Sequence, residues 1–190
     1  MSVINRAPIF TVANLLCYLT MTIQLTSKEK AGIFIEVADF LKGLNLKTVN
    51  QDSTRPWGGF FVIDETQASE FAKLFFPEVN LDDLRISGKL SPKLLLVETN
   101  KRLSWQYHHR RAEIWRVIGG SAGVVTSFTD EEKDKSELHI GDSVRLKQGQ
   151  RHRLVGLNEW GVLAEIWQHT DAANPSDEND IVRVQDDFGR

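Results

Sequence analysis

The sequence predicts a mainly β protein in which a barrel or sandwich of short strands follows a single packing helix. After Arg55, short strand-like runs recur at regular spacing and are separated by turn residues such as Gly119-Gly120. This spacing is typical of all-β sandwiches and barrels. Before Arg55, one segment has a strongly amphipathic helical pattern. We therefore expect an N-terminal segment over residues 1–50 and one β-barrel domain over residues 51–190.

The helix is expected from about Thr26 to Leu44. Thr26 and Glu29 have the spacing of a capping box, in which the Thr caps the first turn and the Glu reaches back to it. Apolar residues then recur on one helical face. They are Phe34, Val37, Ala38, Leu41 and Leu44. We expect this face to cover one side of the barrel or a partner subunit.

Composition and charge exclude several classes of function. The 190 residues are 41% hydrophobic and 26% charged, which is typical of a soluble globular domain. The net charge of −3 gives no electrostatic basis for binding nucleic acid or an anionic membrane. The single cysteine, Cys17, cannot form an internal disulfide. We expect a cytoplasmic protein whose partner is a small molecule, and a homodimer is left open.

An apolar run from Pro8 to Met21 precedes the helix. It is too short to span a bilayer as a helix. Three interpretations remain open: translation begins at Met21, the run packs on the domain as a strand or helix, or it directs export.

The stretch from Arg102 to Gly120 carries residues suited to a metal site. It reads as two strands joined by a polar turn. Because side chains alternate along a strand, Gln106 and His108 share one face, and Glu113 opens the second strand toward the same point. His152 opens a later strand and points back across the barrel. Amide oxygen, imidazole and carboxylate all suit zinc or another divalent first-row metal.

The arrangement of these four residues resembles the two sequence motifs of cupins. The first motif is Gln106-x-His108-x-x-x-x-Glu113, and the second is Gly141…Gly149-x-x-His152. Two positions depart from the usual pattern, because Asn100 stands where a Gly is usual and Lys147 where a Pro is usual. Asn tolerates the left-handed backbone that Gly serves there. The resemblance implies one cupin barrel, a double-stranded β-helix or jelly roll.

A narrower resemblance, covering roughly Arg55 to Arg190, is to the cupin module of type II phosphomannose isomerases. It is carried by Arg55-Pro-Trp-Gly58, Arg102-Leu-Ser-x-Gln-x-His-His, Arg111-Ala-Glu113 and the segment from Asp180 to Arg190. The family usually has a third consecutive His where this chain has Arg110. This difference concerns substrate preference, because Arg110 is not one of the four expected ligands.

The resemblance implies a metal-dependent aldose–ketose isomerase, most simply one that interconverts mannose 6-phosphate and fructose 6-phosphate, with zinc as cofactor. Arginines suit the phosphate. The candidates are Arg102, Arg110, Arg183 and Arg190. The sequence does not identify the general base. Two alternatives stay open: a non-catalytic sugar-binding cupin, and another metal-dependent cupin enzyme such as a dioxygenase.

Overall fold

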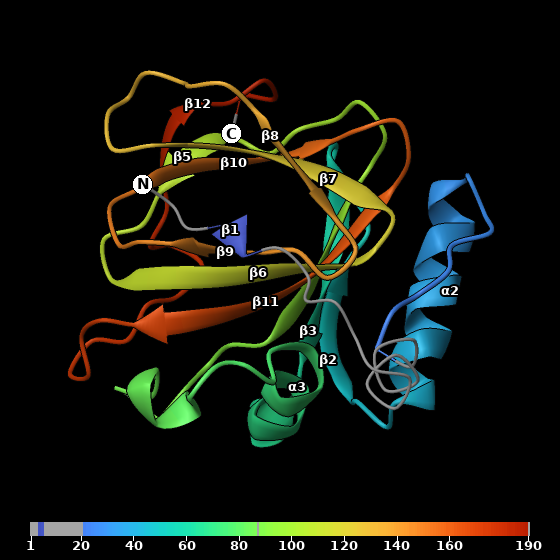
Figure 1. Cartoon of the computed structure of the whole chain (residues 1–190), viewed down its shortest axis with the longest axis horizontal. Coiled ribbons are helices and arrows are strands. Elements are labelled where there is room, and N and C mark those ends of the chain that lie inside the picture. Colours follow the sequence, from blue (N-terminus) through green and yellow to red (C-terminus); the bar gives the residue numbers. More distant parts are fainter. Residues whose placement is uncertain (1–3, 6–20, 87, 190) are drawn as a thin grey trace.

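Two antiparallel sheets face each other in the computed structural model, which describes residues 4–5, 21–86 and 88–189 (Figure 1). The larger sheet has the order β1-β9-β6-β11-β4-β3-β2. Its strands are β1 (Ile4–Asn5), β2 (Thr48–Asp52), β3 (Gly58–Ile63), β4 (Lys93–Val97), β6 (Arg111–Gly119), β9 (Ser143–Leu146) and β11 (Gly161–His169). The smaller sheet has the order β12-β5-β10-β7-β8. Its strands are β5 (Trp105–Tyr107), β7 (Ser121–Ser127), β8 (Ser136–His139), β10 (Arg151–Gly156) and β12 (Val182–Gln185). The expectation of a mainly β barrel is therefore confirmed.

The larger sheet is covered on both faces, and strand β11 shows how the sequence achieves this. Val162, Ala164 and Ile166 belong to the apolar cluster formed with the helices. Leu163 belongs to a second apolar cluster, which fills the space between the two sheets. Because side chains alternate along a strand, one strand supplies both cores. β11 therefore reads as an almost continuous apolar run, as expected for a strand buried on both faces.

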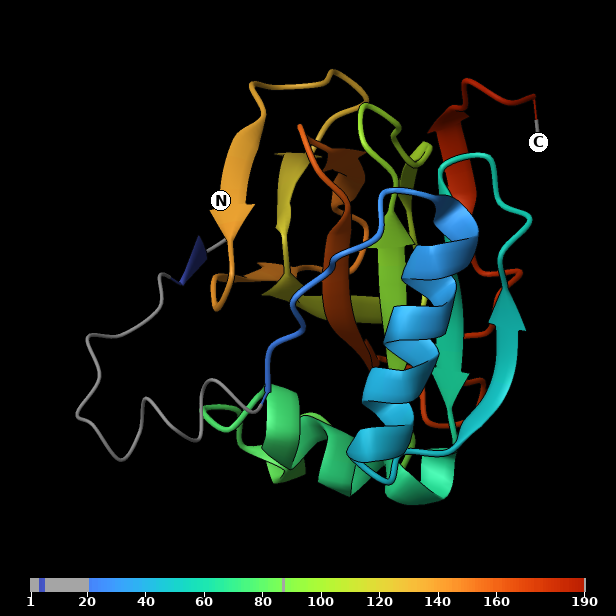
Figure 2. The same ribbon diagram turned by 90° about the vertical axis from the view of Figure 1, so that its right-hand side faces the viewer.

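Helix α2 (Lys30–Gly43) lies against the outer face of the larger sheet (Figure 2). The rings of Phe34 and Phe61 lie 5.2 Å apart, which joins α2 to strand β3. The helix begins four residues later than the expected start at Thr26, so the capping-box prediction was wrong. The backbone N–H and hydroxyl of Thr26 both donate to the carboxylate of Glu36, in the second turn of the helix. This longer-range contact holds Thr26 outside the helix.

Helix α3 (Ala68–Phe75) packs beneath the same sheet (Figure 1). Two short 3₁₀ helices, η1 (Glu65–Gln67) and η2 (Leu81–Asp83), flank it. In the ranges that the structure describes, no helix is both long and apolar enough to cross a membrane.

Two expectations about the N-terminal region keep their status as predictions. All of the apolar run except Met21 lies outside the described residues. Strand β2 (Thr48–Asp52) spans the expected border between residues 50 and 51, and it pairs with β3 as the edge of the larger sheet. The division into an N-terminal segment and a barrel domain stays a prediction.

Candidate metal centre and cavity

The four expected ligands come from both sheets, and all four are buried. Gln106 and His152 are direct cross-strand partners on β5 and β10, so their side chains leave the smaller sheet on one face. His108 follows the end of β5, and Glu113 lies on β6 of the larger sheet. The side chains of His108 and His152 are 2% exposed and that of Glu113 is 3% exposed. Residues separated by more than forty positions are thus brought to one buried point.

Three of the four residues form a compact donor cluster. His108, Glu113 and His152 each present one donor atom within 4.8 Å of the other two. The Nε2 atom of His108 lies 3.2 Å from Oε1 of Glu113, and Nε2 of His152 lies 3.4 Å from Oε2. Ligands held about 2.1 Å from a tetrahedral ion are about 3.4 Å apart. The spacing therefore fits a single first-row metal ion.

The protonation pattern of the two histidines also fits a metal ion. Nδ1 of His108 lies 2.5 Å from the carbonyl oxygen of Asp180, and Nδ1 of His152 lies 2.9 Å from that of Gln150. A carbonyl oxygen only accepts, so each Nδ1 carries the hydrogen and each Nε2 presents a lone pair. Within the described residues, Nε2 of His152 and Oε2 of Glu113 are buried without a hydrogen-bond partner. A cation between them would satisfy both atoms.

Electrostatics keep these groups in the forms that bind a metal. Burial by itself raises the pKa of Glu113, but attraction to neighbouring cationic groups, including the guanidinium of Arg111, holds that pKa well below its ordinary value. Burial lowers the pKa of His152 to about 4, against the opposing attraction of Glu113. At neutral pH, Glu113 is therefore a carboxylate and His152 is a neutral imidazole, as metal ligation requires.

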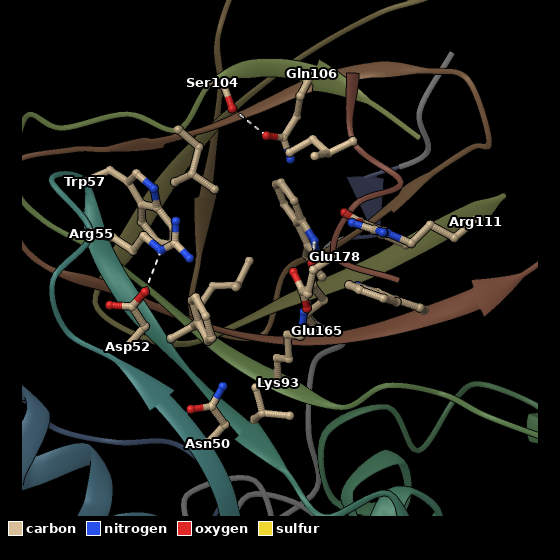
Figure 3. A pocket seen from close by; sticks show the side chains of 18 of the residues that line it. Asn50, Asp52, Arg55, Trp57, Lys93, Ser104, Gln106, Arg111, Glu165 and Glu178 are labelled. Atoms are coloured by element: carbon tan, nitrogen blue, oxygen red, sulfur yellow. Dashed lines mark hydrogen bonds and ion pairs between the residues drawn. The ribbon is translucent and has the colours of Figure 1, made fainter. Parts of the chain in front are cut away.

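Gln106, the remaining expected ligand, lies beside this cluster in the wall of the cavity. Its Oε1 atom accepts a hydrogen bond of 2.6 Å from the hydroxyl of Ser104 (Figure 3). The hydroxyl orients the amide, because Oε1 has to be the acceptor in this contact. The oxygen has a second lone pair for a metal or a substrate hydroxyl. The role of Gln106 as a ligand stays a prediction.

Arg111 is the residue at the centre that ligand spacing did not single out. Its Nε donates to Oε1 of Glu113 over 2.8 Å, and its Nη2 donates to Nε2 of His108 over 3.1 Å. The guanidinium also stacks 3.6 Å from the ring centroid of Trp167. The signal in the sequence was Arg111-Ala-Glu113, since residues two apart on a strand share a face. Arg111 therefore orients Glu113 and partly neutralises its charge.

The segment before β12 closes the centre from outside. The carboxylate of Asp180 accepts the backbone N–H groups of His109 and Arg110 and the hydroxyl of Ser176. Burial raises the pKa of Asp180, but these hydrogen bonds outweigh it and lower the pKa. Because the carbonyl of Asp180 also holds His108, this single residue fixes the turn between β5 and β6.

Two turns flank the centre as the motif resemblance implied. Asn100 has a φ of 59° and Gly149 a φ of 72°, both in the left-handed region. Asn is one of the few residues other than Gly that adopt this conformation readily. The backbone N–H of Gly149 bonds to the carbonyl of His108, which ties the two motifs together.

A cavity of about 490 Å³ opens beside Glu113 (Figure 3). Its walls combine aromatic rings with charged and polar side chains. The charged and polar residues of these walls include Arg55, Lys93, Gln106, Glu165, Glu178 and Arg183. The volume suits a small polar ligand.

The four arginines expected to bind phosphate have different positions. Arg183, on β12, lines the cavity. Arg102 lies outside the cavity lining and pairs through Nε and Nη2 with the carboxylate of Asp187. Arg110 also lies outside it, where its Nη1 donates over 2.6 Å to the side chain of Asn174. Arg190 falls outside the described residues. Arg55, from the Arg-Pro-Trp-Gly stretch, is a further cation in the cavity wall.

The barrel of two facing sheets, with two histidines and a glutamate meeting inside it, defines a cupin. The chain belongs to the family described as mannose-6-phosphate isomerase C-terminal, whose model matches residues 67–186. The expected resemblance to a cupin-type phosphomannose isomerase module is thereby confirmed.

Curated relatives agree with this assignment. The chain is 29% identical over 126 residues to the alginate biosynthesis protein AlgA of Pseudomonas aeruginosa, which covers 66% of this chain and 24% of that protein. It is 30% identical over 130 residues to the xanthan biosynthesis protein XanB of Xanthomonas campestris, covering 66% and 25%. The chain therefore spans about a quarter of the length of these relatives. Among solved structures, procruciferin from Brassica napus aligns with a TM-score of 0.48 at 16% identity, covering 73% of this chain and 30% of that one.

Proposed function

We propose that the protein is a metal-dependent aldose–ketose isomerase of a phosphosugar, with mannose 6-phosphate and fructose 6-phosphate as the substrate pair and zinc as the metal. The observation that carries the proposal is the buried cluster of His108, Glu113 and His152 beside a polar cavity. Membership of the mannose-6-phosphate isomerase C-terminal family supports the choice of reaction. The names of the relatives concern alginate and xanthan biosynthesis, so the activity is a proposal for this chain.

Different residues would hold the metal and the phosphate group of such a substrate. His108, Glu113, His152 and Gln106 would hold the metal, which when bound polarises the carbonyl and hydroxyl oxygens of the sugar. Arg183 carries a fixed positive charge in the cavity wall and is the proposed phosphate ligand.

The cavity also has features that suit the sugar itself. The aromatic side chains of Trp57, Trp115 and Trp167 line it and supply apolar surface for the carbon skeleton. Burial of these groups limits water at the reacting carbons, which protects an enediol intermediate from side reactions.

The deciding experiment is turnover of mannose 6-phosphate by zinc-loaded protein, read by coupled detection of fructose 6-phosphate. We expect turnover with zinc and its loss after chelation, with recovery when zinc is returned. A protein that is folded and loaded with metal, yet interconverts none of a panel of sugar phosphates, contradicts the proposal. Metal content measured on the purified protein separates zinc from iron, which would favour an oxygenase.

A second candidate is a non-catalytic sugar-binding cupin, and one contact favours it. Arg111 donates to both His108 and Glu113, so these two side chains have partners without a metal ion. In this alternative the guanidinium completes the centre and the cavity binds a sugar without converting it. Binding of mannose 6-phosphate with equal affinity in chelated and zinc-loaded protein, together with no turnover, would support this function.

A further inference from the structure

Glu165 is an acidic side chain on the inner face of β11, between the apolar residues Leu163 and Trp167. Leu163 and Trp167, its neighbours on that face of β11, lie in the inner core and the cavity wall. The Glu165 side chain is 4% exposed and borders the same cavity as Glu113 (Figure 3). Burying an ionised carboxyl group at such a position is costly unless it is paired and hydrogen-bonded.

The partners of Glu165 leave its carboxyl group available. Trp115 donates its indole N–H to Oε1 over 2.9 Å, and in the described part of the chain this is the one hydrogen bond the carboxyl group accepts from a side chain. Lys93 is its cross-strand partner on β4, but the ammonium group of Lys93 pairs with Glu178 and lies 4.0 Å from the ring centroid of Trp167. Among the described residues, Glu165 therefore has no direct ion pair, whereas Glu113 pairs with Arg111 over 2.8 Å.

The sheet register places Glu165 one row away from the metal centre. Glu165 pairs with Trp115 on β6, and Glu113 pairs with Trp167 on β11. Glu113 and Glu165 are therefore diagonal neighbours on one face, and such neighbours lie roughly 7–8 Å apart. A ligand that contacts the metal centre through its oxygens would present its adjacent carbons to Glu165.

We propose that Glu165 carries the proton between the two carbons that exchange oxidation state in the isomerisation. This inference rests on the proposed function. The Glu165 carboxylate takes the proton from C2 of the aldose, the C–H electron pair forms the C1–C2 double bond, and the carbonyl electron pair moves onto O1. The same proton then returns to C1, where the electron pair of the C1–C2 double bond takes it up, while the hydroxyl proton on O2 moves to O1 and the electron pair left on O2 forms the C2 carbonyl. All atoms and electrons of the aldose are present in the ketose, so no co-reactant is needed.

The electrostatic surroundings suit this role. Burial, followed by repulsion from Glu113, raises the pKa of Glu165 to about 8, while Lys93, Arg111 and the Trp115 hydrogen bond oppose the rise. Glu178 lines the same cavity and pairs with Lys93, which offsets the charge of that ammonium group. A carboxyl group whose pKa lies near neutrality both accepts and releases a proton readily.

The test compares the wild type with Glu165→Gln, which keeps the size of the side chain and an acceptor for Trp115. For zinc-loaded Glu165→Gln we expect kcat for mannose 6-phosphate to fall at least about 100-fold, with KM and zinc content within about twofold of the wild type. Transfer of deuterium from C2 of labelled mannose 6-phosphate to C1 of fructose 6-phosphate should slow in parallel. Glu65→Gln is the matched control, because Glu65 is a carboxylate outside the cavity that accepts the N–H groups of Leu90 and Ser91.

A second variant keeps the test decisive if Glu165→Gln does not fold. Glu165→Ala leaves space for a small acid, and we expect formate to restore part of its turnover, which a purely structural role would not give. Retention of kcat within about threefold in Glu165→Gln, or absence of formate rescue in a folded Glu165→Ala, overturns the inference. If the wild type is also inactive, the proposed function is wrong. If the wild type and Glu165→Gln are both active, only the role of Glu165 is wrong.

Discussion

The Nε2 atom of His152 lies 3.4 Å from Oε2 of Glu113, and both atoms are buried without a hydrogen-bond partner among the described residues. Because Nδ1 of His152 donates to the carbonyl of Gln150, its Nε2 presents a lone pair toward the carboxylate. Two acceptors that face each other at this distance repel unless a cation lies between them. This relationship is the strongest physical argument for a metal ion at the centre.

Removal of one ligand should weaken metal binding, whereas removal of the adjacent side chain should not. We expect His108→Ala to lower zinc affinity at least about 100-fold, because even loss of an outer hydrogen-bond partner typically lowers it 10- to 100-fold. His109→Ala is the matched control, since His109 is exposed and outside the cluster. Competition with a chromophoric chelator measures both affinities. Equal loss in the two variants would contradict the assigned centre.

Asp180→Ala should affect both stability and the metal centre. The side chain accepts two backbone N–H groups and one hydroxyl, so its removal should cost on the order of 3 kcal/mol of unfolding free energy. The turn that holds His108 would loosen, and we expect zinc affinity to fall about tenfold. Urea denaturation of metal-free protein gives the first quantity and chelator competition the second. A stability change without any change in zinc affinity would show that the turn does not position His108.

Arg183→Ala should weaken phosphate binding through the loss of a specific contact and not through the change in the overall charge of the protein. We expect KM for mannose 6-phosphate to rise about 10- to 100-fold, which corresponds to loss of a charge-assisted hydrogen bond. Arg102→Ala serves as the control, because Arg102 pairs with Asp187 outside the cavity lining. Steady-state kinetics of both variants decides the point. A larger rise in KM for Arg102→Ala would indicate that Arg102, and not Arg183, binds the phosphate.

The raised pKa of Glu165 predicts a pH dependence of stability in metal-free protein. Between its ordinary value of 4.5 and about 8, the folded state keeps a proton on Glu165 that the unfolded state has lost. Stability from this group is therefore complete below about pH 4.5 and falls as pH rises toward 8. Relative to the wild type, Glu165→Gln should gain on the order of a few kcal/mol between pH 5 and pH 8.5. Denaturation of both proteins in chelator at the two pH values measures the difference, and parallel curves would contradict the shift.

The site shows which features were predictable from sequence. Gln106 and His108 were expected on one face because strand alternation is a local property, and Gln106 and His152 do leave their sheet together. Glu165 was not singled out, because its neighbours Trp115 and Lys93 lie about fifty or more positions away. A single acidic residue in an apolar run gives no sign of which cavity it borders.

The start of helix α2 shows the same limit for the fold. Thr26 and Glu29 have the right spacing for a capping box, but Glu36 takes both hydrogen bonds of Thr26. Local propensity is weak enough for such contacts to override it.

The sequence by itself determined the mainly β architecture, the cupin motifs and the residue types of the metal centre, because these follow from short-range alternation and turn chemistry. Only the tertiary structure decided that Arg111 contacts two candidate ligands, that Asp180 holds His108, and that Arg183 rather than Arg102 reaches the cavity. It also decided the charge states of His152 and Glu165. The physical reason is that burial and strand register, which set contacts and pKa values, arise only when distant segments pack together.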